Sequence, residues 1–529
     1  MITETVLYFA RCKNLFDKRM LFIFSEFFKP RDINYVYTNS TYCHNIFFIA
    51  FILYYLNMLF NSLEYLVFFP TVVAVYFISP HRFRWMLLLA ASALFYMAFV
   101  PAYILILGVL IIADYCAGIL IESAAGRKRK FYLFIIILLN VGFLAFFKYY
   151  GFAKENLEAL ANFLRWNYSL PILSILLPIG LSFHIFQAMS YIIEVYRGKQ
   201  PAEKHLGIYA LYIMFFPRLV AGPIERPQHL IHQFREKHFF DYEKAKNGLI
   251  LIMWGMFKKV VIADRAAVLV NTVYNDPFHF SGVPLIVATV FFAFQLYGDF
   301  SGYSDIAVGS ARVLGYDIIN NFNRPYASRS IAEFWQRWHI SLSSWLRDYL
   351  YYPLLFRKPK ITPARVYAAL MATFVIIGLW HGANWTFVIF GTIYGFYLVF
   401  GLWTKTIRLN LINWLKLNQF PTLLKSAQIF TTFSLISFAW IFFRAENLHE
   451  ATYIVRHLFT GQLFVNLPLI ALGGIVLMEI VQYIQGERDI SEILKNQSAL
   501  LRWSAYLFIF WLIIFFGDFG LKPFIYLVF

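Results

Sequence analysis

The sequence predicts an all-α polytopic membrane protein, and three observations favour this fold class. Residues of the AVILMFWYC set make up 60% of the 529 residues, whereas charged residues make up only 14%. A soluble globular chain averages roughly 45–50% apolar and 25% charged residues. The apolar residues also gather in long runs, and short basic clusters separate several of these runs. A chain this apolar needs the bilayer as its solvent, which excludes a disordered, fibrous or ordinary cytosolic protein.

The chain is strongly basic, with 46 Lys and Arg against 29 Asp and Glu and a net charge of +17. In a membrane protein this excess usually decorates cytoplasmic loops, where it sets the orientation and attracts anionic headgroups. We therefore expect membrane lipids, and no nucleic acid, as partners of these charges. Three cysteines, Cys12, Cys43 and Cys116, provide neither a disulfide framework nor a CxxC metal pair, so no redox role is expected.

The first 130 residues indicate where the membrane part begins and how it is oriented. Residues 1–45 contain no uninterrupted apolar span and no signal-peptide cleavage site. Residues 46–80 are almost continuously apolar and are long enough for two short spans. The basic clusters 81–84 and 127–130 are separated by two apolar runs, so both lie on one side, which the positive-inside rule makes cytoplasmic. The Met58 end is then extracytoplasmic.

Further apolar runs continue to the end of the chain and predict roughly eleven to thirteen crossings at about 20 residues each. They cover residues 131–147, 172–195, 208–220, 249–262, 285–297, 366–380, 385–403, 430–443, 467–483 and 503–516. No repeat of fixed period is present, which argues against an inverted-repeat transporter.

Two carboxylates interrupt one of these runs. Residues 294–305 read FQLYGDFSGYSD, with Asp299 and Asp305 as the acids and Gly298 and Gly302 in GxxxG spacing. An ionisable group in hydrocarbon costs several kcal/mol, so it is a functional candidate by default. We favour a tight helix crossing with the carboxylates capped by backbone N–H groups. Direct contact between Asp299 and a substrate is the alternative.

A polar helix is predicted over residues 334–349. At about 100° per residue, one side carries a stripe within roughly 80°: Gln336, His339, Ser343 and Arg347. The segment is too polar for a lipid-facing span and holds no lysine, which interfacial helices usually carry. We therefore expect its polar side to line a wet cavity inside the protein, although an interfacial helix is the alternative.

A histidine stands between two apolar runs, in the segment LWHGANW of residues 379–385. If the basic residues 357–360 are cytoplasmic, a helix rising from Val366 carries His381 roughly 22 Å away, deep in the membrane or toward its outer side. Gly382 and Ala383 are expected to leave open space for a substrate at the imidazole. A lone buried histidine is more often structural, but together with His339 it favours catalysis.

A neutral imidazole can take a proton from a hydroxyl that attacks an activated acyl carbon. The chain has no GxSxG elbow for serine hydrolase chemistry and no HExxH or comparable ligand set for metal hydrolysis. Proton transfer is therefore the favoured role of His381, and no metal site is expected.

These segments together resemble the membrane-bound O-acyltransferase superfamily, within it the bacterial branch that modifies alginate and teichoic acid. The matching segments run in family order: residues 177–183, 215–224, 298–304, 321–326, 335–348, 379–382 and 442–445. Proteins of this branch typically begin with a stretch similar to residues 58–65. The resemblance therefore implies an acyltransferase domain over residues 58–529, and residues 1–57 as an added segment or a wrongly chosen start.

The resemblance implies a bundle with re-entrant or amphipathic helices around a central tunnel. An acyl group, which we expect to be acetyl, passes from a cytoplasmic thioester donor, acetyl-CoA or an acyl carrier, to a hydroxyl acceptor, with no bound cofactor. His381 matches the essential histidine of the family and His339 its second polar position. Relatives work in the bacterial inner membrane with a periplasmic or surface acyltransferase partner that completes transfer to a polysaccharide. His184 departs from the aromatic residue expected there and is interpreted as a tolerated variant.

We predict that His381 is the general base and that His339 positions or polarises the acyl carbonyl. The predicted substrate-binding residues are Gln336, Ser343, Arg347, Asp299 and Asn384. This mechanism requires the imidazole of His381 to be reachable from both aqueous compartments. A transporter or flippase for a lipid-linked glycan or acyl carrier, and a scaffold for a secreted acyltransferase, are the alternatives.

Overall fold

The computed structural model of the chain describes residues 58–166, 178, 180–486, 488, 490–520 and 522–525. Within these ranges every regular element is a helix and no strand occurs. The predicted all-α fold class is confirmed. The predicted segment 1–57 lies outside the described residues, so its separation from residues 58–529 stays a prediction.

Seven helices of the described part are long and apolar enough to cross a membrane. They are α6 (Tyr103–Ser123), Gly126–Phe163, α14 (Val283–Val313), α18 (Pro363–His381), α19 (Trp385–Trp403), α21 (Pro421–Arg444) and α25 (Ala499–Phe516). Shorter apolar helices are α4 (Leu63–Ile78), Leu206–Arg218 and α23 (Leu469–Gln485). The chain is therefore a polytopic membrane protein. Fewer helices reach full length than the crossings expected, because several apolar runs fold into short or broken helices.

The remaining helices are shorter or more polar. They are α5 (His81–Met97), α7 (Gly126–Leu144), α8 (Tyr150–Phe163), α9 (Leu181–Tyr196), α10 (Leu206–Met214), α11 (Pro227–Leu230), α12 (Tyr242–Met256), α13 (Asp264–Tyr274), α15 (Ile331–Arg337), α16 (Ile340–Leu346), α17 (Tyr352–Leu355), α20 (Lys405–Trp414), α22 (Leu448–His457) and α24 (Ile490–Lys495). Single 3₁₀ turns are η3 (Phe216–Arg218), η4 (His232–Arg235), η6 (Pro277–His279), η7 (Pro325–Ala327) and η9 (Leu417–Gln419).

Three π-helical turns interrupt longer helices: η2 (Ala145–Tyr149), η5 (Phe257–Ala263) and η8 (Arg347–Tyr351). A π-helical turn is rare and often occurs at a functional site, because it changes the direction of the side chains that follow. The turn η2 joins α7 to α8, and η5 joins α12 to α13.

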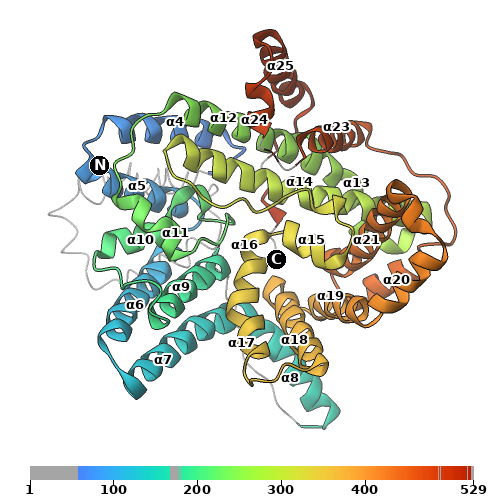
Figure 1. Ribbon diagram of the computed structural model, residues 1–529, viewed down its shortest axis with the longest axis horizontal. Coiled ribbons are helices and arrows are strands. Elements are labelled where there is room, and N and C mark those ends of the chain that lie inside the picture. Colours follow the sequence, from blue (N-terminus) through green and yellow to red (C-terminus); the bar gives the residue numbers. More distant parts are fainter. Residues whose placement is uncertain are drawn as a thin grey trace, which may run out of the picture. The chain divides into compact units, whose positions relative to one another are not determined.

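The core is built on a close crossing of α12 with α14, which run alongside each other in Figure 1. Glycines permit this approach: a Cβ on Gly255 would lie 2.6 Å from the backbone oxygen of Gly302, and one on Gly248 would lie 2.6 Å from that of Gly309. The tight crossing predicted at the GxxxG run is thus confirmed. Of the seven spans in the described part, α14 is the most buried: 72% of the residues in its most apolar stretch of 18 are buried.

The short helices α15 and α16 lie between α14 and the α18–α19 pair (Figure 1). Aromatic contacts hold them there. The ring centroid of Trp338 lies 6.1 Å from that of Tyr297 on α14 and 5.2 Å from that of Trp440 on α21. The ring of Trp335 packs at 5.2 Å against Phe374 on α18. The polar segment therefore lies within the protein, as expected for a cavity-lining element and unlike an interfacial helix.

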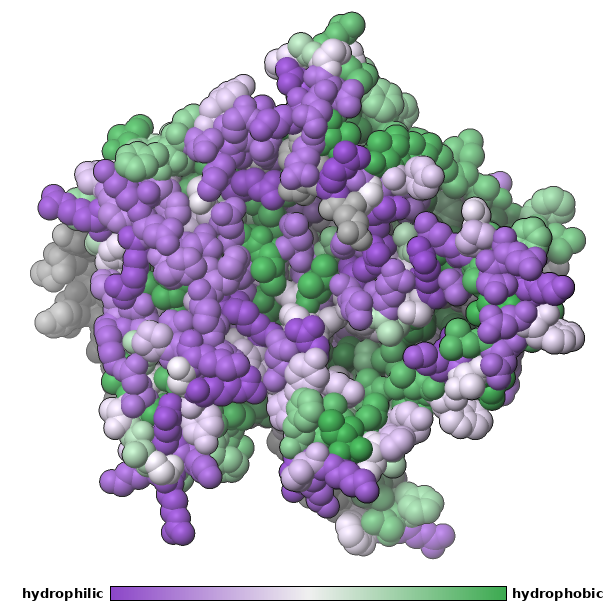
Figure 2. All heavy atoms as spheres, viewed as in Figure 1, coloured by the Kyte–Doolittle hydropathy of each residue, from purple (hydrophilic) through white to green (hydrophobic). Residues whose placement is uncertain are grey.

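Hydrophobic side chains remain exposed on the outer helices, as lipid-facing residues do. Examples on α25 are Leu507, Trp511 and Phe515, which are 48–68% exposed. Figure 2 shows hydrophilic side chains across the middle of one face and hydrophobic ones along much of its margin.

Candidate active site

His381 is held in the last turn of α18, beside the start of α19. Thr362 caps the beginning of α18, where its hydroxyl accepts the amide of Arg365. Asn384 caps α19 by accepting the amide of Thr386 at 3.0 Å, and its side-chain amide donates to the backbone oxygen of Glu446 at 2.8 Å. The Asn384 cap at the start of α19 therefore helps to fix the turn that carries His381.

The two helices of this hairpin touch through glycines. A Cβ on Gly378 would collide with the backbone oxygen of Phe387, and one on Gly391 would collide with that of Phe374. Larger residues at these positions would separate α18 from α19 and move the His381 turn.

Aromatic rings enclose the His381 imidazole, whose residue is only 4% exposed. The ring centroids of Trp380, Phe443 and Phe390 lie 4.9, 5.2 and 5.7 Å from that of His381. The open space expected at Gly382 is not present, because the ring of Phe387 packs where a Cβ on Gly382 would be. This expectation was wrong: the small residue accommodates an aromatic side chain from α19.

His339 breaks the predicted polar helix. The helix was expected to run through residues 334–349, but α15 ends at Arg337 and α16 begins at Ile340. His339 has φ 45° and ψ 56°, a left-handed conformation that is uncommon outside glycine. Residues of the preceding loop form the backbone hydrogen bonds at the break. The amide of Asn323 donates to the backbone oxygen of Arg337 at 2.9 Å, and the amide of Ile340 donates to the backbone oxygen of Asn321 at 2.9 Å.

The His339 side chain is fully buried against Asn321 and Phe300. Its Nδ1 lies 3.3 Å from Oδ1 of Asn321, and its ring meets that of Phe300 edge-on at 4.7 Å. The Trp380 ring is a neighbour of both imidazoles, since its centroid lies 6.2 Å from that of His339 and 4.9 Å from that of His381. The structure thus brings the two predicted catalytic histidines to one aromatic cluster.

Three of the predicted substrate-binding residues, Gln336, Ser343 and Arg347, line one cavity of about 1240 Å³. They line the same cavity although they lie on three successive elements, α15, α16 and η8. The cavity also reaches Ile377, one turn before His381 on α18.

The charges on this large cavity are all positive. Among the residues that the structure describes, its lining includes four cationic side chains and no carboxylate: Arg329, Arg347, Lys405 and Arg408. Most of the remaining lining is apolar or aromatic. The cavity therefore combines a cationic part with an apolar interior, which suits a ligand with an anionic group and an apolar or extended arm.

The other two predicted residues, Asp299 and Asn384, line a second cavity of about 580 Å³. This cavity shares no lining residue with the first and reaches Phe387 on α19, while Gln295 and Arg444 add polar groups. The two cavities thus meet the α18–α19 hairpin before and after His381. His381 itself lines neither cavity, so the access to its imidazole from both sides that the sequence predicted is not present: the rings of Trp380, Phe390 and Phe443 surround it.

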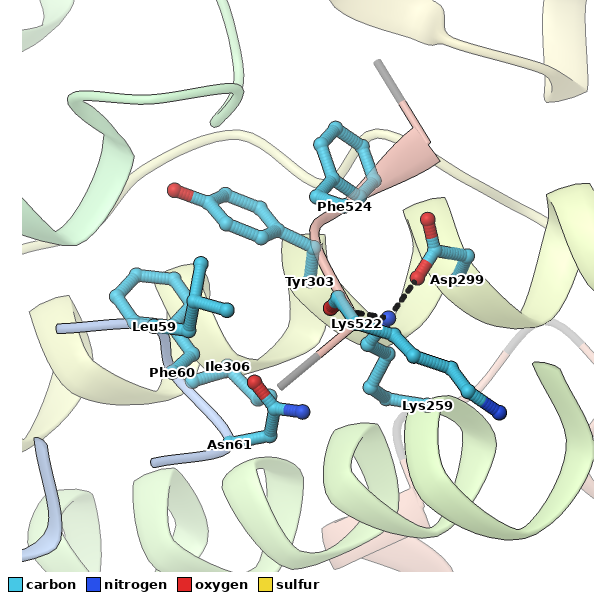
Figure 3. A pocket seen from close by; sticks show the side chains of 9 residues that line it. All are labelled: Leu59, Phe60, Asn61, Lys259, Asp299, Tyr303, Ile306, Lys522 and Phe524. Carbon is cyan, nitrogen blue, oxygen red and sulfur yellow. Dashed lines mark hydrogen bonds and ion pairs between the residues drawn. The ribbon is translucent and has the colours of Figure 1, made fainter. Parts of the chain in front are cut away.

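Asp299 is also part of a buried ion-pair cluster. Its carboxylate lies 2.7 Å from Nζ of Lys259 on η5 (Figure 3). Lys259 also pairs with Asp264 at 2.9 Å. The backbone amide of Ile525 donates to Asp299 at 2.7 Å. Six residues further along α14, Asp305 pairs with Lys258 at 2.7 Å. The two carboxylates are thus paired with two lysines, and Asp299 also accepts a backbone N–H. These contacts support the interpretation of Asp299 and Asp305 as structural groups rather than as contacts for a substrate.

Sequence reasoning missed three residues that shape the site: Phe387, Asn321 and Lys148. Nothing local marks Phe387, whose position follows from the glycine contacts between the helices. Asn321 stands in a loop 18 residues before His339. Lys148 offered a signal, because this charge directly follows the apolar run 131–147 within a helix long enough to span the membrane.

Comparison with known proteins decides the family. Residues 200–443, which contain both histidines, match the model of the MBOAT, membrane-bound O-acyltransferase family. The chain is 37% identical over 400 residues to "Probable alginate O-acetylase AlgI" of Azotobacter vinelandii, covering 74% of this chain and 76% of that relative. The chain belongs to the membrane-bound O-acyltransferase family. The resemblance stated from the sequence is confirmed, and the protein is a multi-pass membrane O-acyltransferase.

Other relatives of this acyltransferase carry related names. "Probable alginate O-acetylase AlgI" of Pseudomonas aeruginosa is 37% identical over 444 residues, 82% of each chain. "Peptidoglycan O-acetyltransferase" of Helicobacter pylori is 32% identical over 398 residues, 70% of this chain and 72% of the relative. Membership of this family favours acyl transfer over the transporter or flippase alternative.

Proposed function

We propose that this acyltransferase passes an acetyl group from a cytoplasmic thioester donor to a hydroxyl of a cell-surface polysaccharide or of a partner protein. The acetyl group and the acceptor class are supported by the names of the relatives, which describe O-acetylation of alginate and of peptidoglycan. The donor is acetyl-CoA or the thioester of an acyl carrier. The protein acts in the bacterial inner membrane, where a periplasmic or surface acyltransferase completes transfer to the polymer.

The large cavity supports the donor assignment. The phosphates of coenzyme A or of a phosphopantetheine arm are anionic, and four cations without a carboxylate line this cavity. Arg357, Lys358 and Lys360, which the charge rule places on the cytoplasmic side, precede the start of α18. A donor bound here has its thioester directed along α18 toward His381, with Gln336, Ser343 and Arg347 as contacts.

The second cavity is the acceptor side in this proposal. It is more polar, and Asn384, Gln295 and Arg444 provide groups that hydrogen-bond a hydroxyl-rich acceptor. The ring of Phe387 lies between this cavity and the imidazole, so it moves when the acceptor hydroxyl reaches His381. The enclosure has a chemical advantage, because exclusion of water protects a thioester from hydrolysis.

The reaction then requires His381 to accept one proton and to release it again. His381 takes the proton of the acceptor hydroxyl while the hydroxyl oxygen attacks the thioester carbonyl carbon. The C–O bond of the ester forms, the C–S bond breaks, and the proton passes to the leaving thiolate to give the free thiol. The observation that carries this proposal is the position of His381 between two cavities of different character.

The contact with Asn321 refines the role of His339. Oδ1 of Asn321 accepts the backbone amide of Ser341 at 3.1 Å, which identifies this atom as the amide oxygen. Nδ1 of His339 therefore carries the proton, and Nε2 carries the lone pair. His339 lies outside the seven candidate spans, and burial lowers its pKa to about 3. A neutral His339 with this tautomer has a lone pair at Nε2 and, with so low a pKa, is a weak base, which favours a positioning role over polarisation of the carbonyl.

The test compares the cell-surface polymer of a deletion strain carrying either the wild-type protein or His381→Ala. Mass spectrometry measures the ester groups and the amount of polymer, and immunoblotting measures the protein in the membrane. The proposal expects loss of the ester with unchanged polymer and unchanged membrane protein for His381→Ala. Loss of the polymer itself contradicts the proposal and supports an exporter, and a normal ester content contradicts the assigned role of His381.

A further inference from the structure

We infer that Lys148 is a positioning residue that holds His381 through the backbone of α18. This inference rests on the proposed role of His381. The ammonium group of Lys148 donates to the backbone oxygen of Trp380 at 2.6 Å and to that of His381 at 3.0 Å. The next residue, Tyr149, donates its hydroxyl proton to the backbone oxygen of Leu379 at 2.7 Å.

These contacts satisfy the end of the helix that carries the imidazole. The last carbonyl groups of an α-helix have no partner within the helix, and an unpaired carbonyl inside a membrane protein is costly. The last carbonyl groups of a helix are usually capped by residues close to them in the sequence. Here three successive carbonyls, those of residues 379–381, are satisfied by two residues of another helix.

The π-helical turn η2 presents both side chains to the same target. Lys148 and Tyr149 are adjacent in sequence, and in a regular α-helix their side chains diverge by about 100°. Both lie within η2, where the helix is locally widened, and both reach one turn of α18. The position of the π-helical turn thus coincides with the point where this helix meets the His381 turn.

The charged group of Lys148 is directed at backbone oxygens. Among the described residues it forms no ion pair with a carboxylate, and the polar atoms that its ammonium group contacts are backbone oxygens. A cation at the C-terminal end of a helix is stabilised by the partial negative charge of the last carbonyls. The ammonium group lies 5.9 Å from the centroid of the Trp380 ring, a further favourable contact.

Lys148 acts on the imidazole rather than on substrates, because it lines neither of the two cavities described above. Loss of its hydrogen bonds frees the last turn of α18, and a displacement of about 1 Å at a reacting group can lower a rate by about 100-fold. Binding of the donor in the large cavity is unaffected by this change. We therefore expect the turnover number to fall while the KM for the donor stays the same.

The experiment compares Lys148→Met with Lys148→Arg in the full-length protein in proteoliposomes, with labelled acetyl-CoA as the donor. Lys148→Met is expected to lower kcat by about tenfold or more with KM within about twofold of the wild-type value. Lys148→Arg keeps the cation and the donor groups, so it is expected to restore most of the lost kcat. The matched control is Lys154→Met, which removes a lysine of α8 that pairs with Glu158 at 2.9 Å.

The outcomes separate this inference from the proposed function. A wild-type kcat for Lys148→Met beside an inactive His381→Ala overturns the positioning role alone. An active His381→Ala overturns the role of His381, on which this inference depends. If Lys148→Met does not reach the membrane, Lys148→Gln replaces it; equal kcat values for Lys148→Gln and Lys148→Arg then contradict the inference.

Discussion

The side-chain oxygen of Asn321 lies 3.3 Å from Nδ1 of His339 and 3.1 Å from the backbone nitrogen of Ser341. One amide oxygen therefore orients the imidazole and also fixes the first turn of α16. Because Asn321 belongs to the loop before α15, a residue 18 positions earlier in the sequence contacts the imidazole of His339.

Asn321→Ala is expected to lower acyl transfer by about 10- to 100-fold, the range seen when the group that orients a functional histidine is removed. The substitution frees the tautomer of His339 and leaves the amide of Ser341 without its acceptor. Transfer from labelled acetyl-CoA in proteoliposomes measures the effect. Asn418→Ala, in the exposed turn η9, is the control. Equal rates for the two variants would show that the Asn321 contact is unimportant.

Substitution of His339 by glycine and by alanine separates the role of the ring from that of the backbone. Both variants lose the imidazole, so both are expected to lose most of the activity. Alanine in the left-handed region at φ 45° costs about 1 kcal/mol more than glycine, so His339→Gly is expected to be the more thermostable of the two. Activity assays and thermal unfolding in detergent check this. Full activity of either variant would reduce His339 to a packing residue.

Gly382→Ala is expected to impair transfer through a steric clash with Phe387. The added Cβ would overlap the ring of Phe387, which is packed against the His381 turn. The ring or the turn must then shift, and overpacking of this kind typically costs about 1–3 kcal/mol of stability. Adding Phe387→Leu should recover part of the activity, since the shorter side chain removes the overlap. A double variant no better than Gly382→Ala would show that the ring is not the obstacle.

Neutralising the cations of the large cavity is expected to weaken donor binding and to leave the chemical step unchanged. Lys405→Gln and Arg408→Gln should each raise the KM for acetyl-CoA by about twofold to fivefold, the size of a solvent-screened charge contact, with kcat unchanged. The difference from the wild type should shrink at high salt. Lys425→Gln is the control, because Lys425 is exposed on α21 and does not line the cavity. An unchanged KM for both variants would remove the charge argument for the donor site.

The membrane fold and the crossing at Gly302 could be predicted from the sequence because they depend on local features. Long apolar runs specify helices in a bilayer whatever their neighbours, and glycines in GxxxG spacing mark a close contact. The residues that pair with the carboxylates of α14 could not be predicted in the same way. Lys258 and Lys259 were visible as an interruption of an apolar run, but their pairing with Asp305 and Asp299 depends on the three-dimensional crossing.

For the candidate site, the sequence indicated some of the residues that line a cavity but not the backbone geometry around the two histidines. Gln336, Ser343 and Arg347 line a common cavity, whereas His339, the fourth residue of the predicted polar stripe, is fully buried and does not line it. The break at His339 was not predictable from helical periodicity, because hydrogen bonds from Asn321 and Asn323 in a preceding loop stabilise it. The enclosure of His381 was missed for a similar reason: Phe387 fills the space beside Gly382 from the following helix.

The most direct test of the account is acetyl transfer by the purified protein in proteoliposomes, with labelled acetyl-CoA on the donor side and a hydroxyl acceptor on the other. The wild-type protein is expected to form labelled ester, while His381→Ala, inserted and folded to the same extent, forms none above background. Ester formation by His381→Ala at a rate near that of the wild type would contradict the account.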